Sequence, residues 1–335
     1  MRGLKFSSMG VILSAVAGVL ALVSTGSMGQ AAVIIATGAN NGDPSHQSGN
    51  FYYSINTATG VATPISPPLT GGSPAGLAGT PDGRLLGFSG GRVGEVNPFA
   101  GTFTPTGVNG GLTITGFDVI HDGRGFGVPV TGSDRRLHRI DLTTSAVTPV
   151  GPAGSVGQAL DSFLGVNTGT TQPFVIGLGS VARRQNTGTV AIPNVVTVST
   201  LYGVHLQGGA NQLVAINPDS GFASVVGSLN SVGLSGNPGA GAYSGFAAMT
   251  GVDENGDGLF DTLYGNVNFF DPDGSGPLTS QRLGGLARYD VGAGTWTMVG
   301  TNPGLIFFGF GTIIPEPGAV GLLALAGVWT LRRRR

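Results

Sequence analysis

The chain has 335 residues, including 62 glycines and 20 prolines but no cysteine, and it carries 17 acidic against 16 basic side chains. Six basic residues and one acid lie in the two end segments, 1–31 and 315–335, which leaves ten arginines against sixteen acids, a net charge of −6, in the centre. This balance lacks the basic surface that DNA- and RNA-binding proteins need, and no nucleic-acid partner is expected. The missing cysteines exclude disulfide bonds, and the Gly-, Thr- and Val-rich composition favours strands and turns over helices.

The first predicted element is a secretory signal peptide over residues 1–31. Arg2 and Lys5 precede the apolar run Val11–Val23, and small residues up to Ala31 follow it. This order of charge, apolar run and small residues is typical of a cleaved signal. An uncleaved N-terminal anchor is the alternative, but thirteen apolar residues are fewer than the ~20 that span a bilayer.

Residues 32–314, about 280 residues, are long enough for one large all-β domain or two smaller ones, and they contain five copies of one short pattern. Each copy reads as a strand, an Asn or Asp, three turn residues, a glycine, and a second strand rich in Thr and Val. The Asn or Asp side chain can bond the turn backbone, and glycine supplies a positive φ. The five turn residues are Asn56, Asn97, Asp141, Asn217 and Asp290, and Ser145 takes the place of the glycine in the third copy.

A second hairpin precedes the turn in several copies. Asp82–Gly83 and Asp122–Gly123 each lie between alternating apolar residues, which is the strongest short signal for a hairpin. Each unit is therefore four short antiparallel strands, and the first three copies repeat about every 40 residues, as in β-propeller blades.

The spacing of the later copies decides the predicted number of blades. These copies are 76 and 73 residues apart, which indicates either diverged blades or insertions in residues 165–198 and 253–282. We favour insertions and five blades, with six or seven as the alternative. Leu305–Ile314 is predicted as an innermost strand that joins a second strand at Ala32–Thr37, because this closes the ring and removes open edges. A β-sandwich or two small barrels is the other fold considered.

One segment has the spacing of a calcium-binding loop. Oxygen-bearing side chains occupy positions 1, 3, 5 and 9 around a glycine at position 6, and the carbonyl at position 7 would add a ligand. Position 12 is Tyr264, where an EF-hand needs a bidentate Glu. The candidate ligands are Asp253, Asn255, Asp257, Leu259 (carbonyl) and Asp261.

The pattern Asp-x-Asn-x-Asp-Gly-x-x-Asp, followed by a strand, resembles the calcium loop of integrin-type FG-GAP propeller repeats. The resemblance covers about fifteen residues in one blade. It implies one calcium ion held by the side chains of Asp253, Asn255, Asp257 and Asp261. Asp271 and Asp273 match the calcium-loop pattern more weakly, and this segment is interpreted as an acidic turn.

No arrangement of residues points to catalysis, so the chain is predicted not to be an enzyme. Gly87–Gly91 matches Gly-x-Ser-x-Gly, but a strand rather than a helix follows it, so it is interpreted as a hairpin turn. Asp118 and His121 could face a propeller channel and are interpreted as strand and turn residues. A pair of carboxylates that the fold brings together for glycoside hydrolysis remains an alternative.

Two arginine pairs, Arg135–Arg136 and Arg183–Arg184, are the only internal basic pairs. Both lie in polar stretches and are interpreted as solvated loops. Contact with an acidic polysaccharide is the alternative.

The last 21 residues predict a membrane segment. Pro315, Glu316 and Pro317 cannot continue a helix, and the uncharged stretch Gly318–Leu331 ends in a cationic cluster that would stay in the cytoplasm. The cluster consists of Arg332, Arg333, Arg334 and Arg335.

This arrangement resembles the PEP-CTERM sorting tail of bacterial exported proteins. The resemblance implies processing near the tripeptide by exosortase, an integral-membrane transpeptidase-like enzyme, after transient anchoring in the inner membrane. It therefore predicts a protein of the cell envelope or extracellular matrix.

The sequence as a whole predicts an exported, non-catalytic propeller with a structural, adhesive or ligand-binding role. Extracellular polysaccharides and surface proteins are the expected partners. A secreted polysaccharide hydrolase or lyase on the same scaffold is the alternative, and a passive spacer is a third hypothesis.

Overall fold

The computed structural model describes residues 33–40, 49–69, 73–129, 136–151, 174–189, 193–207, 210–228, 242–270 and 283–313. The predicted signal peptide, the sorting tail, Arg135, Asp271 and Asp273 lie outside these ranges. Within them, no helix has the length and apolar character needed to cross a bilayer.

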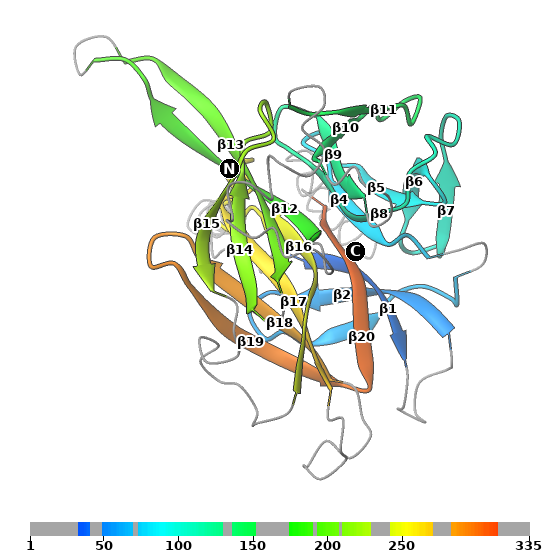
Figure 1. Ribbon diagram of the computed structural model, residues 1–335. Helices are drawn as coiled ribbons and strands as arrows, with labels where there is room; N and C mark the ends of the chain where they lie inside the picture. Colours follow the sequence, from blue (N-terminus) through cyan, green and yellow to red (C-terminus); the bar gives the residue numbers. More distant parts are fainter. Residues whose placement is uncertain are drawn as a thin grey trace, which may run out of the picture.

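The described strands form five four-stranded antiparallel sheets, which we name blades A to E (Figure 1). From the inside outward, blade A consists of β20 (Leu305–Thr312), β1 (Val33–Asn40), β2 (Gly49–Asn56) and β3 (Ala62–Pro64). Blade B consists of β4 (Gly76–Gly79), β5 (Leu85–Ser89), β6 (Arg92–Asn97) and β7 (Thr102–Pro105). Blade C consists of β8 (Ile114–Val119), β9 (Gly125–Pro129), β10 (His138–Ile140) and β11 (Val147–Pro149).

The two remaining blades have longer strands. Blade D consists of β12 (Phe174–Asn186), β13 (Val195–Gln207), β14 (Ala210–Ile216) and β15 (Ala223–Ser228). Blade E consists of β16 (Ala242–Val252), β17 (Thr262–Phe270), β18 (Leu283–Asp290) and β19 (Thr295–Pro303). The prediction of five blades is therefore confirmed, and part of the extra length between the later copies lies in the long hairpins of blades D and E.

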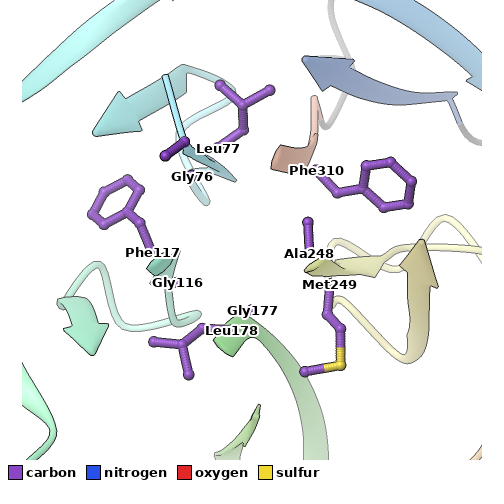
Figure 2. A pocket seen from close by; sticks show the side chains of 10 residues that line it. Gly76, Leu77, Gly116, Phe117, Gly177, Leu178, Ala248, Met249 and Phe310 are labelled. Atoms are coloured by element: carbon purple, nitrogen blue, oxygen red, sulfur yellow. The ribbon is translucent and has the colours of Figure 1, made fainter. Parts of the chain in front are cut away.

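Strands from the two ends of the described chain close the ring. β1 pairs antiparallel with β20, from Ile34 opposite Thr312 to Asn40 opposite Leu305, with a register shift between Thr37 and Gly38. The innermost strands then contact one another in a circle, β4 to β8, β12, β16, β20 and back to β4, and Figure 2 shows residues of all five around one centre. The predicted closed propeller is confirmed.

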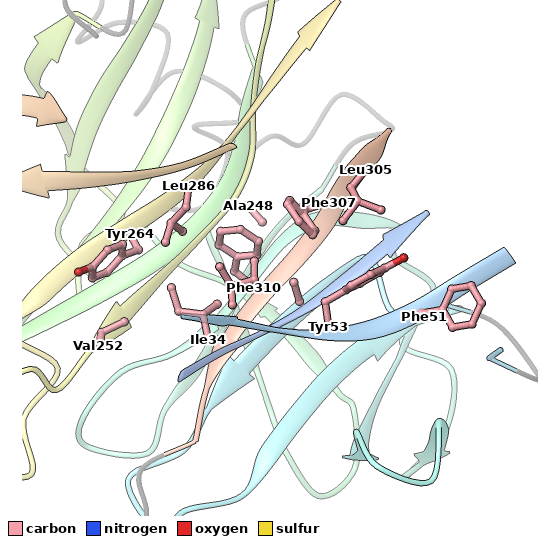
Figure 3. Close-up of a cluster of buried hydrophobic side chains, with 12 residues drawn as sticks. Ile34, Phe51, Tyr53, Ala248, Val252, Tyr264, Leu286, Leu305, Phe307 and Phe310 are labelled. Carbon is pink, nitrogen blue, oxygen red and sulfur yellow. The ribbon is translucent and has the colours of Figure 1, made fainter. Parts of the chain in front are cut away.

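The hydrophobic core lies between the blades rather than in one place. Each of the five blade junctions has its own cluster of buried side chains. Neighbouring residues of one strand serve different junctions, since Ile34 packs toward blade E and Ile35 toward blade B. This follows from the alternation of side chains along a strand. Figure 3 shows the cluster between blades E and A, which includes Phe307 and Phe310 of β20.

All five predicted turns form as expected at the outer edge of the blades. In each, the side-chain oxygen of the Asn or Asp accepts hydrogen bonds from the backbone N–H groups two and three residues later, at 2.8–3.2 Å. The residue four places on has a positive φ, from 62° at Ser145 to 74° at Gly221. The turn chemistry of the repeat is confirmed.

Ser145 has a positive φ, unusual for a non-glycine residue, because its side chain joins two blades. Its hydroxyl is buried, accepts a hydrogen bond from the Val93 N–H at 3.0 Å and donates one to the Thr106 carbonyl at 2.8 Å. The side chain therefore ties the outer turn of blade C to blade B.

We expect Ser145→Ala to lower the free energy of unfolding by about 1–3 kcal/mol, because it leaves the buried Val93 N–H without an acceptor. Ser145→Gly loses the same bonds but relieves about 1–2 kcal/mol of left-handed strain, so it should be the milder change. Urea denaturation of the two variants and the wild type measures this order. Equal stability of the alanine variant and the wild type would contradict the role assigned to the hydroxyl.

Candidate calcium site and central channel

The five Asn and Asp turns of the repeat lie at one face of the ring. Since the strands of a blade alternate in direction, the loop from its first to its second strand and the turn from its third to its fourth lie at the same face; we call this the Asx face. An ion pair between Arg124 and Asp219, at 2.5 Å, links two such loops of blades C and D. The predicted calcium loop, between β16 and β17, lies on the Asx face as well.

The calcium loop is held by its own side chains. Asp253 accepts hydrogen bonds from the N–H groups of Gly256 and Gly258, at 2.7 and 2.8 Å. Asn255 accepts one from Asp257 N–H at 2.9 Å, and Asp257 accepts one from Leu259 N–H at 3.0 Å. Both glycines have positive φ, 75° and 84°, so the sharp turn expected at position 6 is present at Gly258.

The fourth side chain of the predicted set, Asp261, lies against the same loop. One of its oxygens accepts a hydrogen bond from the Glu254 N–H at 3.2 Å, and the other accepts one from the Asn255 amide nitrogen at 2.7 Å. The structure therefore brings Asp261 and Asn255 into contact, but with the amide nitrogen rather than its oxygen toward Asp261.

The residues of the loop suit calcium in their chemistry. Three carboxylates and one amide provide the hard oxygen ligands that Ca²⁺ prefers, and a carboxylate oxygen that accepts one N–H keeps a second lone pair. In the ranges that the structure describes, no three acidic or histidine side chains gather closely enough to form a ready-made metal cluster. Calcium binding would thus require Asn255 and Asp261 to turn toward a common centre, and it stays a prediction.

Glu254 and Tyr264 have a role in the loop that the sequence pattern does not reveal. The Tyr264 hydroxyl donates a short hydrogen bond to Glu254, and Glu254 also accepts one from Thr262 at 3.0 Å and forms an ion pair with Arg288 at 2.6 Å. Burial opposes ionisation of Glu254, but hydrogen bonds from Tyr264, Arg288 and Thr262 lower its pKa. Tyr264, at position 12 of the loop, therefore anchors the loop to blade E through Glu254.

The centre of the ring is filled by uncharged side chains. Its lining includes one large apolar residue from each innermost strand, and the cavity there measures about 10 Å³ (Figure 2), room for about one water molecule. These five residues are Leu77, Phe117, Leu178, Met249 and Phe310. Glycines let the strands approach, since a Cβ on Gly76 would lie 2.7 Å from the Phe117 Cβ.

Asp118 lies beside this layer but faces the junction of blades C and D. It is 3% exposed, and Oδ2 has no hydrogen-bond partner. Burial raises the pKa of Asp118 to about 7, although hydrogen bonds from the Ser180 hydroxyl and from the N–H groups of Val119 and Ser180 lower it. An uncharged pair, Thr250 and Thr312 at 3.3 Å, occupies the junction of blades E and A.

The other candidate residues have structural positions. Gly90 and Gly91, with φ of 58° and 77°, form the turn between β5 and β6, so the hairpin predicted at Gly87–Gly91 is confirmed. The interpretation of Arg136 as solvated is wrong, because it is only 8% exposed. Arg183 and Arg184 are exposed, but on strand β12 rather than in a loop.

Comparison with known proteins describes the fold alone. No protein-family model and no curated protein sequence matches the chain. Its structure is similar to that of a nidogen/laminin complex, with 11% identity, a TM-score of 0.41, and coverage of 83% of this chain and 97% of that chain. TolB from Acinetobacter baumannii is 11% identical, with a TM-score of 0.37, and the match covers 88% of this chain and 71% of TolB. Virginiamycin B lyase from Staphylococcus aureus is 13% identical, with a TM-score of 0.30, and the match covers 71% of this chain and 59% of the lyase.

The sheet topology defines the class of this protein. It is a five-bladed β-propeller of four-stranded blades, closed by strands from both ends of the described chain. Propellers similar to it include both a protein named as an enzyme and a protein in a complex.

Proposed function

We propose that the protein is an exported, non-catalytic propeller that binds an extracellular polysaccharide or another surface protein. The observation that supports this proposal is the layer of apolar side chains across the centre of the ring, which leaves a cavity of only about 10 Å³ there. We therefore expect a ligand to contact the outer loops. The hydrogen-bonded turns of the Asx face give a rigid scaffold for such contacts.

The test is a panel of bacterial and algal polysaccharides offered to the purified residues 32–314. We expect binding without turnover, measured by calorimetry and by release of reducing ends. Turnover that disappears when one or two carboxylates are replaced would instead establish the polysaccharide hydrolase or lyase. Failure to bind any polymer or surface protein would leave the passive spacer.

The route to the surface is proposed from the resemblance of residues 315–335 to a PEP-CTERM tail. Exosortase is the proposed partner, and the inner membrane would hold the chain before processing. Cell fractionation should find the protein at the surface with the four terminal arginines present and in a different fraction without them. An unchanged distribution would refute the proposed sorting signal.

We also propose that the calcium loop binds one Ca²⁺ through Asp253, Asn255, Asp257, the Leu259 carbonyl and Asp261. The ion would replace hydrogen bonds inside the loop and hold the ends of β16 and β17 together. At a free calcium concentration 100 times the Kd, binding stabilises the folded state by about 2.7 kcal/mol.

Chelation is therefore expected to lower the Tm of residues 32–314 by about 5 °C, and added calcium should restore it. Asp257→Asn keeps an acceptor for the Leu259 N–H but loses a charge, so its Tm should no longer respond. Glu95→Ala, a change at an exposed acid of blade B, is the control and should respond as the wild type does. A wild-type Tm that ignores calcium would remove the site.

A further inference from the structure

We propose that the projecting hairpin of blade D and the groove at its base bind an extended polypeptide segment that carries acidic and β-branched side chains. This inference rests on the proposed binding function and assigns one kind of partner to it. We call residues 181–186 of β12 and 195–200 of β13 the arm; Figure 1 shows it extending from the ring.

The first observation is an open strand edge. β13 has 13 residues, of which only Leu201–Gln207 pair with β14. The arm residues Val195–Thr200 pair with β12 on one side, and no strand in the described part of the chain pairs with them on the other. Alternate residues of this edge therefore direct their N–H and C=O groups outward, which is the template for strand addition.

The second observation is a groove directly below that edge. It has a volume of about 400 Å³ and lies between Val198–Thr200 of the arm and the turn from β14 to β15. Val198 and Phe222, both among its lining, are 41% and 48% exposed. A peptide strand added beside β13, in line with β14, would place every second side chain over this groove. A Val or Ile side chain at these positions would bury its own apolar surface and that of Val198 and Phe222.

The third observation is the charge of the arm. Arg183 and Arg184 are exposed and lie opposite Val198 and Thr197 across the hairpin. Among the residues that the structure describes, ion pairs are found for Arg84, Arg124 and Arg288 but not for Arg183 or Arg184. Hydrogen bonds from the turn backbone lower the pKa of Asp290, and Arg183 helps to lower it from a distance. The side chains of Arg183 and Arg184 are long enough to extend over the intervening strand, so they favour a segment with Asp or Glu.

The same charges select against a second copy of this chain. Pairing two arms edge to edge would offer these arginines no carboxylate, because Arg183 and Arg184 are the only charged side chains among residues 181–186 and 195–200. The partner inferred is therefore a segment of a different protein that is extended, acidic and rich in Val, Ile or Thr.

The test is selection of displayed random ten-residue peptides on residues 32–314. We expect enrichment of sequences that alternate β-branched with acidic residues. Fluorescence polarisation then measures the Kd of one selected peptide. The double change Arg183→Glu, Arg184→Glu should weaken its Kd at least tenfold. Arg92→Glu, at an exposed arginine of blade B, should leave the Kd unchanged, and Tm values of both variants report that the ring is intact.

Several results would overturn the inference. These are the absence of an acidic bias among the selected peptides, a Kd that the arm variant does not change, and failure to select any peptide. A wild-type dimer in light scattering that the arm variant dissociates would assign the arm to self-association. Polysaccharide binding without peptide binding would refute this inference alone and leave the proposed function standing.

Discussion

Replacing Phe307 with alanine is expected to lower the free energy of unfolding by about 3–5 kcal/mol. Phe307 belongs to the closing strand β20 and is fully buried between blades E and A (Figure 3). Its ring meets Tyr53 edge-on, with 5.9 Å between centroids, and lies 5.7 Å from Phe310. Gly38 and Gly284 also pack against this ring, and because they have no side chains they cannot fill the cavity that the alanine would leave.

The neighbouring residue provides a matched control. Phe308 lies on the same strand but points the other way and is 37% exposed, so Phe308→Ala should cost about 1 kcal/mol or less. Guanidinium denaturation of both variants measures the difference. Equal costs would contradict the view that burial between blades, rather than strand propensity, holds β20 in place.

Asp118→Asn is expected to remove a pH dependence of stability that the wild type shows. The folded-state pKa of Asp118, about 7, lies above its ordinary value of 3.8. The folded protein therefore binds the proton more tightly than the unfolded chain, so this residue's contribution is fully present below about pH 4 and is lost as the pH rises through 7. The difference between the two pKa values corresponds to a change of about 4 kcal/mol in the free energy of unfolding.

The physical reason is a buried carboxylate among uncharged neighbours. The groups that interact with it are the Ser180 hydroxyl and two backbone N–H groups, and none of them compensates fully for the loss of water. Urea denaturation at pH 4.5 and pH 8 measures the stability of both proteins. Other carboxylates titrate in both, so the quantity to compare is the wild-type value minus the Asp118→Asn value, and a difference that is the same at both pH values would refute this account.

The fold could be predicted because the information for it is local. Asn56 and its four counterparts accept bonds from residues two and three places away, so the turn is encoded within five residues. Blade closure could also be predicted, because Leu305–Ile314 reads as an innermost strand and Ala32–Thr37 as a second strand. The structure places β20 beside β1 as expected.

The chemistry at the junctions could not be predicted, because it depends on residues far apart in the chain. Asp118 has an unremarkable setting in the sequence, and its hydrogen-bond partner Ser180 comes from the next blade. Glu254 looks like a spacer between two calcium ligands until Arg288, 34 residues later, pairs with it. The arm was missed because the residues around Arg183 and Arg184 resemble a polar loop, and only the pairing of β12 with β13 reveals a strand.

The place of β20 has a consequence for biosynthesis. This strand is translated last among those of the ring, yet it completes the sheet that was translated first. In a chain that ends before residue 305, the edge of β1 that pairs with β20 would stay unpaired, and unpaired strand edges promote aggregation. Maturation of this molecule thus depends on complete translation, and fragments would be distinguishable from finished product by their sensitivity to proteases.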